Sequence, residues 1–291
     1  MKPLLMDVWA CPACHGALEA ATAQVRCRAC GRAYPIVQGV PILLGDGAQV
    51  TARPMERDAG LGARLRRWSM APPTSFKRRA ARERLPTFVQ SLGPAARIVN
   101  VGAKESNLGD QVLNLDLGLF AGVDVVGDAT RLPLQDESVD AVITQGVLEH
   151  VRHPEQAAAE IWRVLRPGGW TYHETPFIQG YHADPTDYQR FTLDGLAALF
   201  DGFEVLERGI VAGPSSALTW ILREYLAMLF AFNNPILYAL GKRLFGWLTA
   251  PVKYLDTILA GSRYAPKIAS AFYLIARKPA LAEADLTATR G

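Results

Sequence analysis

The clearest hydrophobic pattern in the chain is a strand, helix and strand unit between residues 127 and 175. Residues 139–143 (VDAVI) form a β-branched run typical of a strand buried on both faces of a parallel sheet. From Pro154 the apolar positions fall three or four residues apart, which predicts a helix that Gly168-Gly169 ends before a strand at 170–175. The polar loop between the first strand and the helix lies where open α/β sheets bind ligands.

Three further apolar runs extend this predicted sheet. Residues 97–102 (RIVNVG) predict a first strand and a glycine turn, residues 111–115 a second strand, and residues 123–127 a third. The second strand begins only about ten residues after the first, which is barely enough for a crossover helix. The first helix is therefore expected to be short or missing, within a sheet of the α/β class.

Two motifs flank the predicted helix. Leu148-Glu-His-Val151 follows the strand at 139–143, and residues 163–169 read RVLRPGG. In this order the segment resembles the class I S-adenosylmethionine (SAM)-dependent methyltransferase family, of the type 11 kind. The resemblance implies a Rossmann-like sheet, SAM as methyl donor, and a closing antiparallel hairpin formed by residues 203–211 and 269–276. The competing interpretation is another α/β domain with a Pro-Gly-Gly turn.

The resemblance also implies where SAM binds. Gly102 lets the backbone approach the ligand closely, and Asp116, at the end of the second strand, accepts hydrogen bonds from both ribose hydroxyls. Asp128 and Ala129 lie at the adenine edge, and Gln145 lies near the methionine end. The glycine-rich loop of the family is reduced here to a single glycine turn at Gly102, so SAM affinity is the weakest part of this prediction.

A polar loop at residues 181–191 (YHADPTDYQRF) is the candidate acceptor site. It resembles the H-x-D-P-T-D-Y-x-R segment of a methyltransferase subgroup associated with glycan and cell-envelope biosynthesis. Acceptor contacts are expected from five side chains: His173, Asp184, Asp187, Tyr188 and Arg190. The alternative is a loop held by pairing of aspartate with arginine and by an Asx turn, without catalysis.

The predicted reaction needs few catalytic groups. Transfer of a methyl group from an electrophilic donor requires alignment, and a base where the nucleophile is a hydroxyl. His182 is the first candidate for that base and His150 the second, although for Glu149 and His150 a hydrogen-bonding role that fixes the loop is an equal alternative. A second metal at His173, His182 and Asp184 is a further alternative that lacks a known ligand spacing.

All four cysteines lie within the first 30 residues as two C-x-x-C pairs: Cys11 and Cys14, Cys27 and Cys30. Four thiolates around one tetrahedral Zn²⁺ leave no open position, so a structural zinc ion is expected. No secretory signal is recognised near Lys2, which favours a reducing cytoplasm over the alternative of disulfides or free thiols. Residues 4–44 resemble the small zinc-ribbon family that activates methyltransferases of tRNA, rRNA and translation factors, which implies scaffolding through a strand edge or apolar face, or substrate positioning.

Composition divides the chain into residues 1–50 (zinc ribbon), 51–90 (basic linker), 91–280 (methyltransferase domain) and 281–291 (tail). The net charge is only +3, but residues 53–84 hold ten Lys/Arg against three Asp/Glu. Apolar positions at residues 61–68 predict a short basic amphipathic helix there. Such a segment suits RNA phosphate, anionic lipid or an acidic sugar, or simply faces solvent.

Residues 214–266 form an apolar insert between the last two predicted strands. They hold nine of the 26 aromatic residues and only seven charged ones. Residues 225–241 carry no charge, but Asn233-Asn-Pro235 divides them, and they are shorter than the ~20 apolar residues of a membrane span. Two amphipathic helices against a membrane or over a lipid-like acceptor are predicted, with a buried hairpin or a dimer interface as equal alternatives.

These patterns together predict a Rossmann-like class I methyltransferase with an amino-terminal zinc ribbon and a helical insert. We expect it to transfer a methyl group from SAM to a small, lipid-linked or glycan acceptor, in the cytoplasm or peripherally at the inner face of the membrane. The zinc ribbon and basic linker favour an RNA methyltransferase as the alternative. The sparse loop after Gly102 favours a second alternative, a non-catalytic binding protein. The residues leave the acceptor and the oligomeric state, a homodimer included, open.

Overall fold

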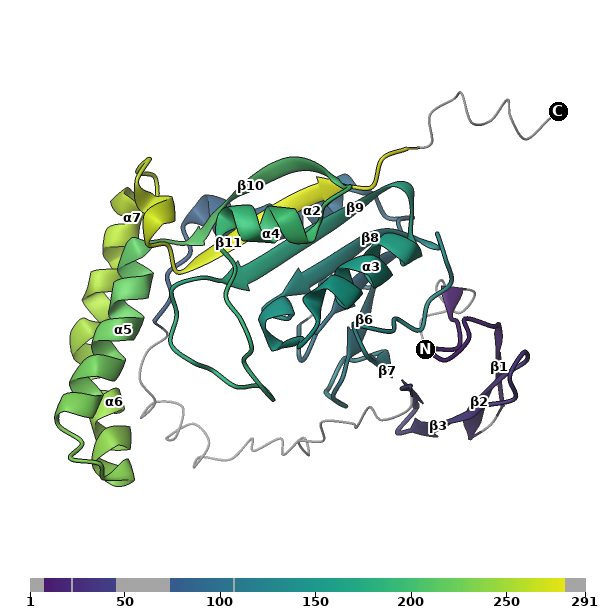
Figure 1. Ribbon diagram of the computed structural model, residues 1–291, viewed down its shortest axis with the longest axis horizontal. Coiled ribbons are helices and arrows are strands. Elements are labelled where there is room, and N and C mark those ends of the chain that lie inside the picture. Colours follow the sequence, from purple (N-terminus) through teal and green to yellow (C-terminus); the bar gives the residue numbers. More distant parts are fainter. Residues whose placement is uncertain (1–7, 22, 46–73, 107, 281–291) are drawn as a thin grey trace.

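The computed structural model describes residues 8–21, 23–45, 74–106 and 108–280 (Figure 1). An eleven-stranded sheet runs through them in the order β1-β2-β3-β4-β7-β6-β5-β8-β9-β11-β10. The amphipathic helix predicted at residues 61–68 and the tail at 281–291 lie outside the described residues.

The centre of the sheet consists of five parallel strands, which two antiparallel strands extend at one edge. In spatial order these strands are β7 (Val125–Gly127), β6 (Val112–Asp116), β5 (Ile98–Val101), β8 (Val139–Gln145), β9 (Leu165–Pro176), β11 (Ala271–Arg277) and β10 (Glu204–Ala212). The β5 and β6 strands are buried along their whole length, as expected for parallel strands covered on both faces. This order confirms the Rossmann-like fold and the closing antiparallel hairpin.

The connection between β5 and β6 contains only turns and irregular chain in its described residues, 102–106 and 108–111. The prediction that the first crossover helix is missing is therefore confirmed for that part of the connection. Its turn is tied back to the sheet, because the amides of Gly102 and Ala103 both donate to the carbonyl of Leu115.

Helices cover both faces of the sheet (Figure 1). On one face α2 (Arg79–Ser91) packs Leu85, Phe88 and Val89 against a cluster that includes Tyr172. On the other face α3 (Pro154–Val164) and α4 (Leu193–Leu199) bury their apolar sides in the larger core cluster. The expected linker boundary at residue 90 was therefore wrong, because the sequence from Arg79 onward is a helix with buried apolar positions.

The boundary between α3 and β9 also differs from the prediction. The helix ends at Val164 and the strand begins at Leu165, which pairs with Val139, rather than after the two glycines. Gly168 and Gly169 lie inside the strand, where the pairing with β8 shifts register between Val139 and Ala141. A Cβ at Gly169 would stand 2.8 Å from a backbone oxygen, so the glycines allow an irregularity in the strand rather than ending the helix.

The amino-terminal strands continue the same sheet. β1 (Leu18–Ala20), β2 (Gln24–Cys27), β3 (Ala33–Val37) and β4 (Val40–Leu43) pair antiparallel in chain order. β4 then pairs in parallel with β7, with Ile42 beside Val126 and Leu43 beside Gly127. Trp9 and Leu43 pack into the core cluster that also holds the central strands. The cysteine-bearing segment is thus joined to the sheet by backbone pairing and by a shared core.

The predicted insert is a helical hairpin followed by short helices. It consists of α5 (Pro214–Leu229), α6 (Pro235–Thr249), η3 (Ala250–Leu255), α7 (Asp256–Leu259) and η4 (Ala265–Lys267). Figure 1 shows α5 and α6 side by side at the end of the molecule opposite the amino-terminal strands. None of the helices in the described part of the chain is long and apolar enough to cross a membrane.

Pairing of β4 with β7 predicts that loss of metal from the cysteines loosens the sheet edge. In Cys14→Ser protein, or after chelation, we expect amide exchange in β4 and β7 to accelerate at least tenfold, about 1.4 kcal/mol of local stability, while β9 stays protected. Hydrogen exchange read by mass spectrometry measures this, with zinc-restored wild type as the control. Unchanged exchange at Val125–Gly127 would contradict the coupling.

Candidate active site

The four cysteines form one cluster, with Cys11 and Cys27 buried and Cys14 and Cys30 exposed. Their sulfur atoms lie 3.7 Å apart between Cys11 and Cys30 and 3.5 Å apart between Cys14 and Cys27. Tetrahedral Zn–S bonds of ~2.3 Å place neighbouring sulfurs about 3.8 Å apart. The cluster is therefore compatible with a structural zinc ion.

Polar groups around the cluster suit thiolates. The Tyr34 hydroxyl lies 3.0 Å from the Cys11 sulfur, and the Cys30 amide donates to the Cys27 sulfur at 3.4 Å. A Cβ at Gly16 would stand 2.7 Å from the Cβ of Ala29, so only glycine leaves room for the two thiol-bearing turns to close. These contacts orient metal ligands without leaving a position for substrate.

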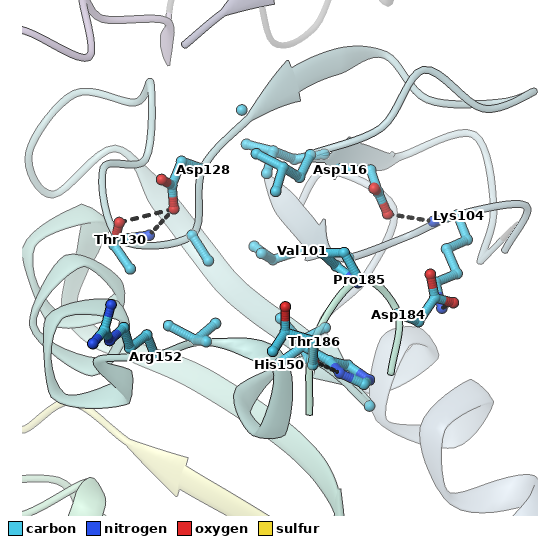
Figure 2. A pocket seen from close by; sticks show the side chains of 18 of the residues that line it. Val101, Lys104, Asp116, Asp128, Thr130, His150, Arg152, Asp184, Pro185 and Thr186 are labelled. Atoms are coloured by element: carbon cyan, nitrogen blue, oxygen red, sulfur yellow. Dashed lines mark hydrogen bonds and ion pairs between the residues drawn. The ribbon is translucent and has the colours of Figure 1, made fainter. Parts of the chain in front are cut away.

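A cavity of about 370 Å³ lies at the carboxyl ends of the parallel strands (Figure 2). It is within the size range of small-molecule sites. Gly102, Asp116, Asp128 and Ala129 line it, so the structure brings together four of the five predicted donor-site residues. Gln145 instead lines a second, more open cavity of about 460 Å³, which Gly102 and Gly146 connect to the first by lining both.

Gly102 is required by its position. Its φ of +72° lies in the left-handed region that side chains disfavour. A Cβ there would stand 2.2 Å from Cγ2 of Val147, in the loop after β8. The single glycine of this turn therefore allows the β5 and β8 loops to approach each other at the cavity.

Asp116 is held rigidly at the end of β6. Its Oδ2 accepts from the Lys104 amide and its Oδ1 from the Gly118 amide, both at 2.8 Å (Figure 2). Burial raises the pKa of this carboxyl above its usual range, while the two amides act in the opposite direction. Each oxygen has one further lone pair for a ligand hydroxyl.

Asp128 forms a turn at the end of β7. Its Oδ1 accepts from both the amide and the hydroxyl of Thr130, each at 2.8 Å (Figure 2). This is an Asx turn that presents the remaining carboxylate oxygen and the Ala129 backbone to the cavity. Leu115 and Phe120 provide apolar surface on the same side, which suits a planar ring.

The loop at residues 181–191 forms a wall of the same cavity. Asp184, Pro185, Thr186 and Tyr188 line it, and Asp184 pairs with Lys104 at 2.6 Å. Asp184 and Tyr188 were predicted to contact an acceptor. The structure places both in the cavity that also contains Asp116 and Asp128. Their position therefore does not indicate contact with an acceptor alone, because the donor is predicted to bind in the same cavity.

Backbone contacts fix this loop over the residues after β8. His150 Nδ1 contacts the Thr186 carbonyl at 2.5 Å, and the Tyr188 amide donates to the Glu149 carbonyl at 2.8 Å. The Gln189 side chain donates to the carbonyl of Val151 at 2.8 Å. The loop therefore has a defined position rather than that of an open flap.

Asp187 and Arg190 do not face the cavity. Asp187 pairs with the guanidinium of Arg190, and its side chain is only 2% exposed. The guanidinium holds the pKa of Asp187 down to about 2, although burial acts against it. The predicted acceptor contact of these two residues was wrong, and the alternative of an internal pair that holds the loop is correct.

His173 is a core residue. Its ring is fully buried, stacks on Phe200 at 3.9 Å between centroids, and lies 2.7 Å from the hydroxyls of both Thr144 and Thr171. Burial lowers the pKa of this imidazole to about 3, so it is neutral. Contact with an acceptor, or with a metal shared with His182 and Asp184, was therefore a wrong prediction, because an alternating strand directs this side chain inward.

Three side chains gather beside the cavity instead: Glu149, His150 and His182. Oε1 of Glu149 lies 3.8 Å from Nε2 of each histidine. The neighbouring carboxylate raises the pKa of His182, while partial burial acts against it. Proximity of the two candidate bases to each other was not visible in the sequence, where they stand 32 positions apart.

The site also contains residues that sequence reasoning missed. Lys104 contributes an amide to Asp116 and an ammonium to Asp184. Glu174, buried at the end of β9, pairs with Lys77 at 2.7 Å in the second cavity. Trp220 of α5 lies against His182, with ring centroids 5.7 Å apart. No local motif marks these contacts, which join segments far apart in the chain.

Family comparisons match two parts of the chain. A methyltransferase domain model matches residues 100–173, and a Trm112p-like protein model matches residues 2–39. The chain thus combines a class I methyltransferase domain with an amino-terminal Trm112p-like zinc-ribbon domain, as the motifs predicted.

Individual relatives match over short stretches. An uncharacterised 37.1 kDa protein from a transposon of Streptomyces fradiae is 38% identical over 85 residues, which cover 29% of this chain and 24% of that protein. The mitochondrial 2-methoxy-6-polyprenyl-1,4-benzoquinol methylase of Mus musculus is 37% identical over 78 residues, 26% of this chain and 24% of that protein. The chain therefore spans about a quarter of the length of these curated relatives.

Among solved structures, the complex of the Haloferax volcanii Trm112 methyltransferase activator with a methyltransferase aligns with a TM-score of 0.40 and 16% identity. The alignment covers 69% of this chain and 94% of that one.

If Asp116 binds SAM, Asp116→Asn should weaken SAM binding strongly. Loss of hydrogen bonds to a charged acceptor typically costs about 1.5–3 kcal/mol, so the Kd should rise by roughly 10- to 100-fold. Calorimetric titration of zinc-loaded protein with SAM measures this. Asp110→Asn, an exposed change in the preceding loop, is the matched control and should leave the Kd unchanged. Equal affinity of both variants would remove Asp116 from the donor site.

Proposed function

We propose that this protein is a SAM-dependent methyltransferase that methylates a small polar acceptor carried on a lipid. The observation that carries the proposal is the juxtaposition of the cavity containing Asp116 and Asp128 with the Glu149, His150 and His182 cluster, which in turn abuts the apolar hairpin. A donor site, a polar acceptor position and an apolar surface thus follow one another along one side of the sheet.

The residues of the main cavity fit the donor. SAM supplies a methyl group on a positively charged sulfonium, a strong electrophile. Asp116 has free lone pairs for the ribose hydroxyls, and the Asx turn at Asp128 offers a carboxylate oxygen at a ring edge. Gly102 and Gly146 line both cavities where they meet, so this is the natural position for the reacting end.

The acceptor needs to enter beside His150, which lines the main cavity. Catalysis of methyl transfer consists mainly of aligning the nucleophile with the donor and excluding water. The loop at residues 181–191, fixed over the β8 loop, provides that exclusion. Action of His182 and His150 as bases stays a prediction. His150 lines the main cavity, and the His182 ring lies 5.3 Å from the His150 ring between centroids, which supports it.

The lipid part of the proposal rests on the helical hairpin. On α5 the exposed apolar residues are Leu218, Ile221, Tyr225, Met228 and Leu229; on α6 they are Leu237, Leu240, Leu244, Trp247 and Leu248, with Ile236 exposed beside them in the first turn. Both sets have the spacing i, i+3, i+7, i+10 and i+11, so each helix presents one continuous apolar stripe. Close packing of Gly241 on Ala227 brings the helices together through small residues and leaves the large ones outside.

Charge on this hairpin favours an anionic lipid surface over a second protein. Both acidic residues of the insert have partners: Glu224 of α5 pairs with Arg223 and Lys242, and Asp256 of α7 accepts from the amides of Ser215 and Ser216 at the start of α5. Although burial would raise the pKa of Glu224, hydrogen bonds from its partners lower it, so it is charged and compensated. Among the described residues of the insert, the exposed charges are cations such as Arg243 and Arg263.

The hairpin is coupled to the site. Trp220 packs beside His182, and its ring occupies the space where Gly180 would carry a Cβ, 2.5 Å from the indole nitrogen. An acceptor lying along α5 with its tail in lipid would therefore present its head beside the cluster. The polyprenyl acceptor in the name of the mouse relative supports a lipid-linked substrate class.

Methyl transfer tests the proposed reaction. With methyl-labelled SAM and an extract of the source cells separated into lipid, RNA and water-soluble fractions, we expect label in the lipid fraction. Asp116→Asn should reduce it at least tenfold, in proportion to its loss of SAM affinity. Label confined to RNA would replace the lipid acceptor with an RNA acceptor, and SAM binding without label in any fraction would indicate a non-catalytic protein.

The hairpin predicts binding to anionic membranes. Cosedimentation with vesicles of phosphatidylglycerol and phosphatidylcholine should fall at least tenfold in the double variant Leu240→Glu and Trp247→Glu, because both residues lie on the α6 stripe. Leu206→Glu on β10, another exposed apolar position, is the matched control and should bind like wild type. Undiminished vesicle binding by the double variant, or a change in oligomeric state without vesicles, would contradict the membrane assignment.

A further inference from the structure

We propose that Glu149, His150 and His182 bind a divalent transition-metal ion, distinct from the zinc of the cysteine cluster. The three side chains come from two separate segments, the short helix η2 (Leu148–His150) and the loop at residues 181–191. They converge between the main cavity and Trp220 of α5.

The separations suit a shared cation. One ligand atom from each residue lies within 4.8 Å of the others, and Oε1 of Glu149 is 3.8 Å from both imidazole Nε2 atoms. At 3.8 Å the carboxylate is too far from either nitrogen for a direct hydrogen bond. Ligands bound to one ion at ~2.1 Å stand roughly 3 to 4 Å apart, so the ion fits with a small closure of the side chains.

The outer nitrogens of both rings are already used. His150 Nδ1 contacts the carbonyl of Thr186, and His182 Nδ1 contacts the carbonyl of Gly180 at 3.2 Å. Because a carbonyl only accepts, each Nδ1 carries the proton in a neutral ring and each Nε2 presents a lone pair to Glu149. Donation of the second ring nitrogen to a backbone carbonyl is the usual arrangement of metal-binding histidines.

Arg190 does not reverse this assignment. Its Nη2 lies 3.3 Å from His182 Nδ1. A hydrogen bond from Nη2 to Nδ1 would require a lone pair on Nδ1 instead of a proton. However, Nη2 has only two hydrogens, and it donates to Asp187 Oδ2 at 2.5 Å and to the Gly180 carbonyl at 3.2 Å. Both hydrogens are therefore engaged, which leaves His182 Nδ1 free to donate to Gly180.

Glu149 supplies the independent observation. Its side chain is 1% exposed, and its Oε2 is buried with no hydrogen-bond partner among the residues that the structure describes. An ionised carboxylate buried in this way requires a cation or a set of donors. A single proton on one histidine would leave the lone pair of the other still facing the carboxylate, whereas one metal ion satisfies all three groups.

The donor set indicates the class of metal. Two imidazole nitrogens and one carboxylate oxygen suit Zn²⁺, Mn²⁺, Fe²⁺ or Co²⁺ rather than the all-oxygen preference of Ca²⁺. Three protein ligands leave positions open, as in catalytic rather than structural sites. Only the consequence for catalysis rests on the proposed function: a Lewis acid here would position and polarise an oxygen of the acceptor, and it would take the place of a histidine base, because both Nε2 lone pairs would bind the ion.

Metal uptake tests the proposal without SAM or acceptor. Full-length protein with zinc on its cysteines is titrated with Co²⁺ and followed by visible absorption and by metal analysis after dialysis. We expect the protein to bind one equivalent of Co²⁺ in addition to its zinc, as a second equivalent of metal. The visible spectrum of this Co²⁺ should lack thiolate-to-metal charge-transfer bands. His182→Gln and Glu149→Gln should each weaken its binding at least tenfold, and His150→Gln provides a third variant if one of these does not fold.

The matched control is His153→Gln. His153 is an exposed histidine 3.3 Å from Glu155, a similar pair that lacks a third ligand, so its loss should leave the second equivalent in place. Two outcomes would overturn the proposal. One is uptake of cobalt by the cysteine cluster alone, and the other is a second equivalent that persists in folded variants at residues 149, 150 and 182. Because the readout is metal content, failure of methyl transfer would not affect the result.

Discussion

The site depends on parallel strands that end at one level of the sheet. Val101 at the end of β5 pairs with Leu115 on one side and Thr144 on the other, so the loops that follow all leave at the same edge. At Gly102 the loop after β5 passes closest to the loop after β8, because the Val147 side chain occupies the space that a Cβ would need. Two backbone amides hold the Asp116 carboxylate at the same edge of the sheet. The main cavity is therefore shaped by main-chain geometry at the glycine turn and at Asp116.

The zinc-ribbon strands are part of this arrangement. β4 adds to the sheet at β7, the strand whose end carries Asp128, so a segment too small to hold its own core supports one wall of the cavity. At the opposite end the helical hairpin contacts the loop that carries His182. The two additions to the methyltransferase sheet thus adjoin different parts of the site, the side of Asp128 and the side of His182.

The sequence located three residues that line the main cavity, because Gly102, Asp116 and Asp128 each follow a strand that a local pattern predicts. That they bind SAM stays a prediction. Sequence reasoning was less successful in the loop at residues 181–191, where residue type alone does not distinguish a ligand contact from an internal pair. Asp187 and Arg190 hold the loop together, whereas Asp184 lines the cavity, and only the fold separates these roles. The prediction that His173 contacts an acceptor failed for a related reason, since the alternation of side chains along β9 directs His173 into the core.

The sequence by itself determined the order of the strands in the methyltransferase domain, the helix after Pro154, the cysteine cluster, the apolar insert and the residues at the strand ends, because these follow from periodicity and short spacing. Tertiary structure alone decided the junction of β4 with β7, the start of β9 before Gly168 and Gly169, the pairing of Lys104 with Asp184, and the meeting of Glu149, His150 and His182. These contacts join segments distant in the chain. Their formation depends on strand register and loop closure, for which no local pattern codes.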